Sequence, residues 1–193
     1  MSLGVLRVLG IDPGTRALGW GVVERNGTRL VHVAHGVIRA SGDLPLCERL
    51  VLIERELVEV VATHSVHFAS IEAMFFHKDA QAAAKLGHAR GVAMLVCARA
   101  GLPIFEYPPA RVKRVVAGTG RAEKSQVAMM VQALLKLVEL PPSDAADALA
   151  ISITHLQRSP LDARAALRPQ TPQVRTPLRA PLNPVRAKRV KLA

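Results

Sequence analysis

The sequence is poor in aromatic residues and in cysteine. Its 193 residues include four Phe, one Trp and one Tyr, so aromatic side chains make up only 3% of the chain. Its two cysteines, Cys47 and Cys97, fall in apolar helical patterns without metal-ligating neighbours. This pattern argues against a cysteine-based metal site and indicates two reduced core residues, which fits a reducing cytoplasm.

Long hydrophobic runs are also lacking. No apolar run reaches the roughly 18 residues that a membrane-spanning helix needs, and the residues after Met1 lack the charged and then apolar order of a secretory signal. We therefore expect a soluble cytoplasmic protein without a membrane partner.

Positive charge is abundant and unevenly placed. The formal net charge is +11, and residues 158–193 hold nine Lys and Arg against one Asp, with six prolines and no aromatic residue. Such a segment cannot bury enough apolar surface to offset its ordering entropy. The chain is therefore predicted to have one domain, residues 1–157, and a disordered basic tail, residues 158–193. A basic excess of this kind is typical of proteins that bind nucleic acids or anionic membranes.

The hydrophobic pattern predicts a mixed α/β sheet in the first 157 residues. Short apolar or alternating segments predict strands, and apolar residues at spacings of three and four predict helices. In the first predicted helix these residues are Cys47, Leu50, Val51, Leu57, Val58 and Val61. The predicted strands are 5–12, 17–24, 29–39, 66–72 and 103–107, and the predicted helices are 44–62, 78–100, 122–138 and 143–157.

Four acidic residues occupy positions that suit a metal site. Asp12 and Glu72 each stand at the end of an apolar strand, and functional groups gather at the carboxyl ends of strands in α/β sheets. Asp144 and Asp147 are three residues apart and lie on one face of a helix. Together the four carboxylates would repel one another unless two divalent cations neutralised them, and two such ions can act on a phosphodiester. Ligands that are all oxygen favour Mg²⁺ or Mn²⁺ over zinc.

Simpler explanations of single residues stay open from the pattern alone. Asp144 could cap its helix, and Asp12 could be an ordinary turn residue before Pro-Gly. The segment 118-GTGRAEKS-125 approaches a phosphate-binding loop but has Glu123 where the second glycine must stand. A nucleotide-using enzyme, a binding module with structural acids and a metal nuclease without junction preference, including an RNA-directed one, are the rival functions.

Five segments together resemble one known family. They are 9-LGIDPGTRALGWGVV-23, 71-IEAMFF-76, 85-KLGHARGVA-93, 104-IFEYPPARVKRVVAGTGRAEKSQV-127 and 143-SDAADALAISITH-155, and they resemble the RuvC family of bacterial Holliday-junction resolvases.

The resemblance implies an RNase H-like fold and a homodimer. It also implies Mg²⁺-dependent nicking of two opposed strands at a four-way DNA junction during recombination and repair, in company with a branch-migration complex similar to RuvA and RuvB. It places Asp12, Glu72, Asp144 and Asp147 on the catalytic acids of the family, with two Mg²⁺ per subunit and Mn²⁺ as a possible substitute.

Basic and aromatic residues near these acids are candidate DNA contacts. Phe75 and Phe76 follow Glu72 closely and could stack on bases at an opened junction, although such a pair is as often part of a core. By resemblance Lys113 and Lys124 lie beside the metal site, and Lys124 could stabilise charge developing on the phosphoryl group. A solvated basic face is the alternative for the candidate phosphate contacts, which are Arg111, Lys113, Arg114, Arg121 and Lys124.

Two further patterns have a structural explanation first. His77, His88 and His155 are interpreted as structural histidines, with His155 in a capping or core position. Ala84, Gly87 and Gly91 permit close approach of another helix, either within the chain or across the dimer that the resemblance implies.

Overall fold

The computed structural model describes residues 5–73 and 80–157. Both candidate stacking residues, Phe75 and Phe76, as well as His77 and the basic tail, lie outside this part of the chain. The strands are β1 (Leu6–Asp12), β2 (Ala17–Asn26), β3 (Arg29–Arg39), β4 (Phe68–Glu72) and β5 (Ile104–Tyr107), and the helices are α1 (Leu46–His64), α2 (Ala80–Arg99), α3 (Pro109–Ala117), α4 (Lys124–Leu135) and α5 (Ser143–Leu156).

The strands form one mixed sheet in the order β3-β2-β1-β4-β5. β1, β2 and β3 form an antiparallel meander, whereas β4 and β5 run parallel to β1 on its other side. Ile11 of β1 pairs with Ile71 of β4, so the next residues, Asp12 and Glu72, end neighbouring strands at the same edge. The sheet thus fixes two of the predicted acids side by side.

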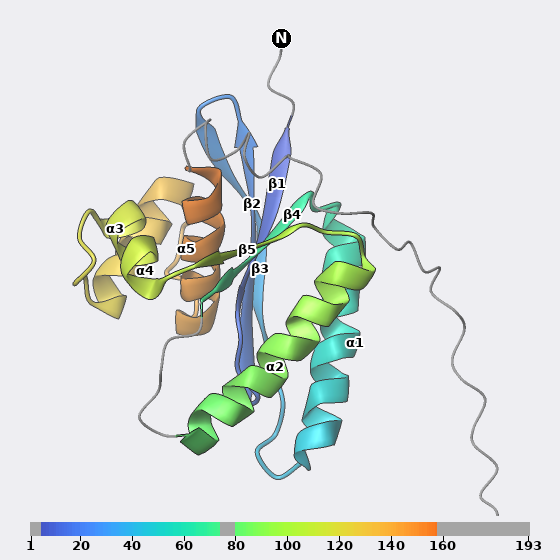
Figure 1. The fold of residues 1–193 in the computed structure, drawn as a ribbon. Helices are drawn as coiled ribbons and strands as arrows, with labels where there is room; N and C mark the ends of the chain where they lie inside the picture. Colours follow the sequence, from blue (N-terminus) through green and yellow to red (C-terminus); the bar gives the residue numbers. More distant parts are fainter. Residues whose placement is uncertain (1–4, 74–79, 158–193) are drawn as a thin grey trace, which may run out of the picture.

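Helices cover both faces of the sheet. α1 and α2 lie on one face, and α3, α4 and α5 lie on the other (Figure 1). The strand period of two divides the core accordingly: Leu9 and Ile11 of β1 pack toward α1 and α2, whereas Val8 packs toward α5. The fold is therefore a three-layer α/β structure, as predicted.

α5 lies against the backbone of β1 and β2 because three glycines leave room for it. A Cβ atom added to Gly10 would overlap the carbonyl oxygen of Ala148, and one added to Gly19 would overlap that of Asp144. At Gly21 it would lie 2.7 Å from the side chain of Leu149. The hydroxyl of Ser152 donates a buried hydrogen bond of 2.7 Å to the carbonyl oxygen of Gly21. The start of α5 is thereby fixed over the end of β1.

The structure corrects the predicted elements at two places. α3 was not predicted, because Pro108 and Pro109 precede a strongly basic segment; Pro109 in fact occupies the first helical turn, where its missing N–H costs nothing. The helix predicted to reach residue 138 ends at Leu135, because Lys136 adopts a left-handed conformation (φ 54°). Among the described residues, no helix has the length and apolar character needed to cross a bilayer.

The buried side of α1 also differs from the prediction. Ile53, Leu57 and Val60 are its buried residues, whereas Cys47 is exposed and Val51 is 64% exposed. Both stripes recur at helical spacing, and the packing of α1 against α2 and β3 selects the one that the prediction mostly left out. The expectation that Cys47 is a core residue was therefore wrong, whereas Cys97 is buried as expected.

Candidate active site

Four carboxylates gather at the edge where β1 and β4 end. Asp12 and Glu72 are the last residues of these strands. The backbone of Asp144, in the first turn of α5, lies against Gly19, and Gly19 is the residue of β2 that pairs with Asp12. Asp147 follows one turn later on the same helical face. The acids that sequence spacing singled out therefore share one site in the folded chain.

Asp12 is the most strongly perturbed of these acids. Its pKa is raised from 3.8 to about 7, first by burial and then by the negative charges of Asp147, Glu72 and Asp144, whereas Lys124 opposes the shift. Burial also raises the pKa of Glu72, and Asp147 adds to that effect while Lys124 and Lys113 oppose it. Mutual repulsion of this kind is expected where several carboxylates share a partly desolvated space.

Lys124 supplies the nearest positive charge. It is the first residue of α4, and its ammonium donates a hydrogen bond of 2.8 Å to Oδ2 of Asp147. This bond is the largest cause of the raised pKa of Lys124. The Lys124 side chain is 72% exposed, whereas that of Asp147 is 25% exposed, so the pair stands at the mouth of the acid cluster.

The residue types fit a hard divalent cation, but the side chains as they stand do not form a ligand cage. Within the described ranges, no three His, Cys, Asp or Glu side chains come close enough together to hold one ion. The ammonium of Lys124 already neutralises Asp147. Burial and then the neighbouring acids raise the pKa of Asp12, so a cation bound by carboxylate oxygens, such as Mg²⁺ or Mn²⁺, would stabilise its charged form.

Two alternative explanations for these residues are not supported. Pro142 is the N-cap residue of α5, without a side-chain capping bond, so Asp144 does not cap this helix. The N-cap of α4 is Glu123, which forms a reciprocal capping box with Gln126. An acid at this position would repel a bound phosphate, which argues against the nucleotide loop.

The candidate phosphate contacts are distributed over α3 and the start of α4. Lys113 is half-buried on α3 and near enough to Glu72 to affect its pKa. The guanidinium of Arg111 lies 5.4 Å from the centre of the Tyr107 ring, in a cation–π contact. Arg114 and Arg121 are exposed. The charges of Lys113 and Lys124 act on the acids, which places these two residues at the cluster.

Sequence analysis missed a buried arginine behind the site. Arg90 of α2 is 8% exposed; its guanidinium donates a hydrogen bond of 2.6 Å to the backbone carbonyl of Glu72 and forms an ion pair of 2.6 Å with Glu106 of β5. In the sequence it stands in the segment 88-HARGVA-93, where nothing distinguishes it from a surface arginine.

Of the histidines in the described residues that were interpreted as structural, His155 is confirmed as a core residue. It is fully buried on α5, and its Nδ1 is 3.0 Å from the hydroxyl of Tyr107. Its ring also contacts those of Phe68 and Phe105. His88 is exposed on α2. The rings of His155, Phe68, Phe105 and Tyr107 thus pack together and join α5 to β4 and β5.

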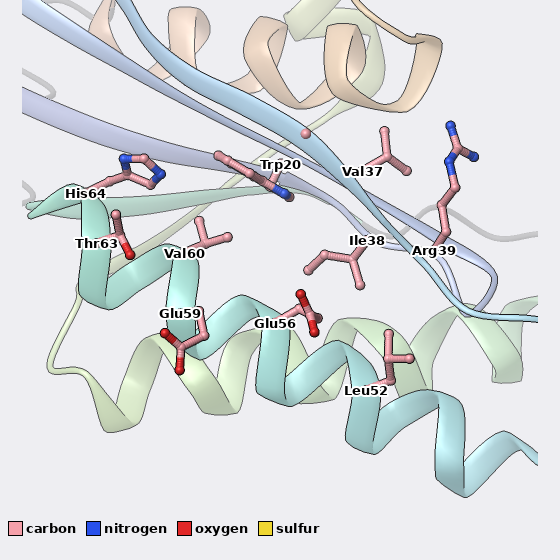
Figure 2. A pocket seen from close by; sticks show the side chains of 11 residues that line it. Trp20, Val37, Ile38, Arg39, Leu52, Glu56, Glu59, Val60, Thr63 and His64 are labelled. Carbon is pink, nitrogen blue, oxygen red and sulfur yellow. The ribbon is translucent and has the colours of Figure 1, made fainter.

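A cavity of about 560 Å³ lies on the opposite face of the sheet, between α1 and β3. Trp20 and Ile38 of the sheet and Glu56 and Glu59 of α1 are among the residues that line it (Figure 2). No residue of the carboxylate cluster lines this cavity. It is therefore separate from the candidate active site.

A mixed sheet of this order, covered by helices on both faces, together with an acidic centre at the ends of β1 and β4, defines an RNase H-like protein. The family model for crossover junction endodeoxyribonuclease RuvC matches residues 8–155. The chain therefore belongs to the RuvC family.

Individual relatives agree with this assignment. A crossover junction endodeoxyribonuclease RuvC from Sorangium cellulosum is 59% identical over 151 residues, which cover 78% of this chain and 84% of the relative. The RuvC protein of Bradyrhizobium diazoefficiens is 50% identical over 152 residues, 79% of this chain and 87% of that protein.

Solved structures are similar as well. The structure of T. thermophilus RuvC in complex with Holliday junction substrate has a TM-score of 0.74 and 38% identity, and covers 78% of this chain and 93% of that chain. The yeast mitochondrial Holliday junction resolvase Ydc2 has a TM-score of 0.56 over 77% of this chain and 78% of that chain; at 13% identity, it supports the fold alone. The predicted RNase H-like fold is thus confirmed.

Proposed function

We propose that this protein is a homodimeric endonuclease that resolves four-way DNA junctions by paired, metal-dependent nicks in opposed strands. The observation that carries this proposal is the convergence of four acids from β1, β4 and α5, where burial and then the neighbouring carboxylates raise the pKa of Asp12. A structural role would not require four mutually repelling carboxylates at one strand edge. Recruitment of divalent cations explains them.

Asp12, Glu72, Asp144 and Asp147 are the proposed ligands for two Mg²⁺ ions, which Mn²⁺ could replace. Ions held there would supply a Lewis acid for the scissile phosphate and lower the pKa of a bound water. The sheet holds Asp12 and Glu72 rigidly, whereas α5 brings Asp144 and Asp147 over them. With the backbone fixed in this way, ion binding would require only rotation of the four side chains and release of Asp147 by Lys124.

Lys124 has a second proposed role at the scissile strand. Its ammonium is bonded to Asp147 in the free protein and is 72% exposed, so it can turn toward a bound phosphate. There it would stabilise negative charge that develops on the phosphoryl oxygens. Lys113, at the Glu72 side of the cluster, would contact the same strand.

The remaining DNA contacts are proposed around this centre. Arg111, Arg114 and Arg121 would bind neighbouring phosphates, and Phe75 or Phe76 would stack on a base at the opened junction. The tail, residues 158–193, would add salt-sensitive affinity that does not depend on DNA structure. A branch-migration complex similar to RuvA and RuvB is the proposed partner in the cell.

A homodimer is proposed because two opposed nicks require two sites. Along α2, the residues Ala84, Gly87, Gly91 and Leu95 recur at spacings of three and four and are wholly or partly exposed, with Leu95 48% exposed. Small residues beside one large apolar residue permit a second helix to pack closely. We assign this stripe to the dimer interface.

Cleavage of labelled DNA by the Asp147→Asn variant tests the proposed function. The wild-type protein should cut a four-way junction in opposed strands with Mg²⁺ or Mn²⁺, and should leave a matched linear duplex intact. Asp147→Asn should lower the cleavage rate at least 100-fold, since metal-site carboxylates act as a unit. Junction affinity should persist or rise in this variant, because one negative charge near the DNA is removed.

The matched control is Glu139→Gln, which removes an exposed carboxylate outside the cluster and should cut at the wild-type rate. Binding of the junction without cleavage in either metal would instead favour a junction-binding module. Equal cleavage of linear and four-way DNA would favour a nuclease without junction preference.

A further inference from the structure

We infer that Arg90 is a positioning residue for the active site: it fixes the end of β4, and with it the carboxylate of Glu72, from the opposite face of the sheet. This inference rests on the proposed function, because it assigns to Glu72 the role of a metal ligand.

The position of Arg90 is unusual for an arginine. It is 8% exposed on α2, and its guanidinium makes one contact with each of two parallel strands. It donates a hydrogen bond of 2.6 Å to the carbonyl oxygen of Glu72, and it forms an ion pair of 2.6 Å with a carboxylate oxygen of Glu106. A buried guanidinium without such partners is strongly unfavourable, so both contacts hold the helix and the two strand ends together.

A second interaction secures the same point of the chain. The N–H of Ala73, directly after β4, donates a hydrogen bond of 2.8 Å to the carbonyl oxygen of Tyr107 in β5. Both polar groups of the peptide that joins Glu72 to Ala73 are thus hydrogen-bonded, the carbonyl oxygen to Arg90 and the N–H to β5. Glu72 therefore has little freedom to move away from Asp12.

The effect of Arg90 is geometric rather than electrostatic. Its guanidinium contacts the backbone carbonyl of Glu72 and the carboxylate of Glu106, rather than the carboxylate of Glu72. The charge of Arg90 is paired with Glu106 and with a backbone carbonyl. Replacing Arg90 should therefore displace the Glu72 carboxylate without changing the charge of the acid cluster. We therefore expect metal binding to weaken while junction binding is retained.

The test compares Arg90→Lys and Glu106→Gln with Arg99→Lys. A lysine retains the charge but lacks the planar fork that reaches two acceptors. Glu106→Gln is the milder change, because the Glu106 side chain is 48% exposed. Arg99→Lys is the matched control, since Arg99 lies on the same helix, is 55% exposed and pairs with Glu54 away from the site.

Mn²⁺ binding is measured by electron paramagnetic resonance in the absence of DNA. We expect the Mn²⁺ concentration for half-saturation to rise about 10-fold in Arg90→Lys and about 3-fold in Glu106→Gln. Cleavage should need correspondingly more metal, whereas the junction dissociation constant in EDTA should stay within 2-fold. Amide exchange of Ala73 should accelerate in both variants while exchange in α5 is unchanged. Arg99→Lys should match the wild type throughout.

Three results would overturn the inference. One is wild-type metal binding in both variants. The second is a loss of metal binding together with accelerated amide exchange throughout the core. That result would mean that Arg90 stabilises the fold as a whole and does not specifically position Glu72. The third is an unchanged exchange rate at Ala73. If the wild-type protein failed to cut junctions, the proposed function would fall, but the exchange and Mn²⁺ measurements would still decide the role of Arg90.

Discussion

Asp12 makes the metal-free protein sensitive to pH. Because the pKa of this carboxyl rises from 3.8 to about 7 on folding, the folded chain holds the proton more tightly than the unfolded chain between these values. Stability must then fall as the pH rises through this window. The cause is the cost of charging a buried carboxylate beside three others.

The variant Asp12→Asn tests this cost. An amide has the shape of the protonated carboxyl group but stays uncharged at high pH. In EDTA at pH 8 we expect its melting temperature to exceed that of the wild type by about 3–6 °C, or about 1–2 kcal/mol. The difference should shrink toward zero below pH 4. Thermal melts across this range measure it. A difference that does not change with pH would mean that charge is not the cause.

At the scale of the elements, the contact between α5 and the first two strands determines the site. Gly10→Ala would push a methyl group into the carbonyl oxygen of Ala148, so the helix would have to move outward. We expect a loss of about 3 kcal/mol in the free energy of unfolding, measured in urea, and weaker metal binding. Gly42→Ala is the control.

At Gly42 the added Cβ would lie 3.2 Å from the end of the flexible Arg16 side chain, which can move aside. That variant should stay within about 0.5 kcal/mol of the wild type. Equal losses in the two variants would show that the α5 contact is not the sensitive one.

The elements were largely predictable from the sequence because their signals are local. All five strands follow from short apolar segments between turn residues, and Asp12 and Glu72 follow from the ends of two of them. The helix α3 was not predicted, because two prolines followed by several basic residues are also typical of a loop. Proline at the start of a helix and within a loop look alike in a single sequence.

Tertiary contacts were the part that could not be predicted. The interactions of Arg90 join α2 to β4 and β5, and nothing near Arg90 in the sequence marks its partners. The exposure of Cys47 and Val51 had the same cause, since α1 carries two apolar stripes and only packing selects one of them.

At the scale of the whole molecule, the proposed dimer depends on the exposed stripe of α2. Leu95→Asp should place a charge on the large apolar residue at the end of that stripe, and we expect a monomer by sedimentation velocity at micromolar concentration. Single, unpaired nicks should then replace paired ones. Val138→Asp is the control, because Val138 is 96% exposed beyond α4. A Leu95→Asp protein that stayed dimeric would place the interface elsewhere.

The proposed metal site draws its ligands from the first strand and from the last described helix. Asp12 and Asp147 meet only after nearly the entire domain has been synthesised and α5 has packed onto Gly10 and Gly19. A nascent or prematurely terminated chain that ends before α5 therefore lacks two of the four acids. On the ribosome, such an incomplete product would be unable to damage the chromosome, and the order of the chain itself delays the appearance of a hazardous activity.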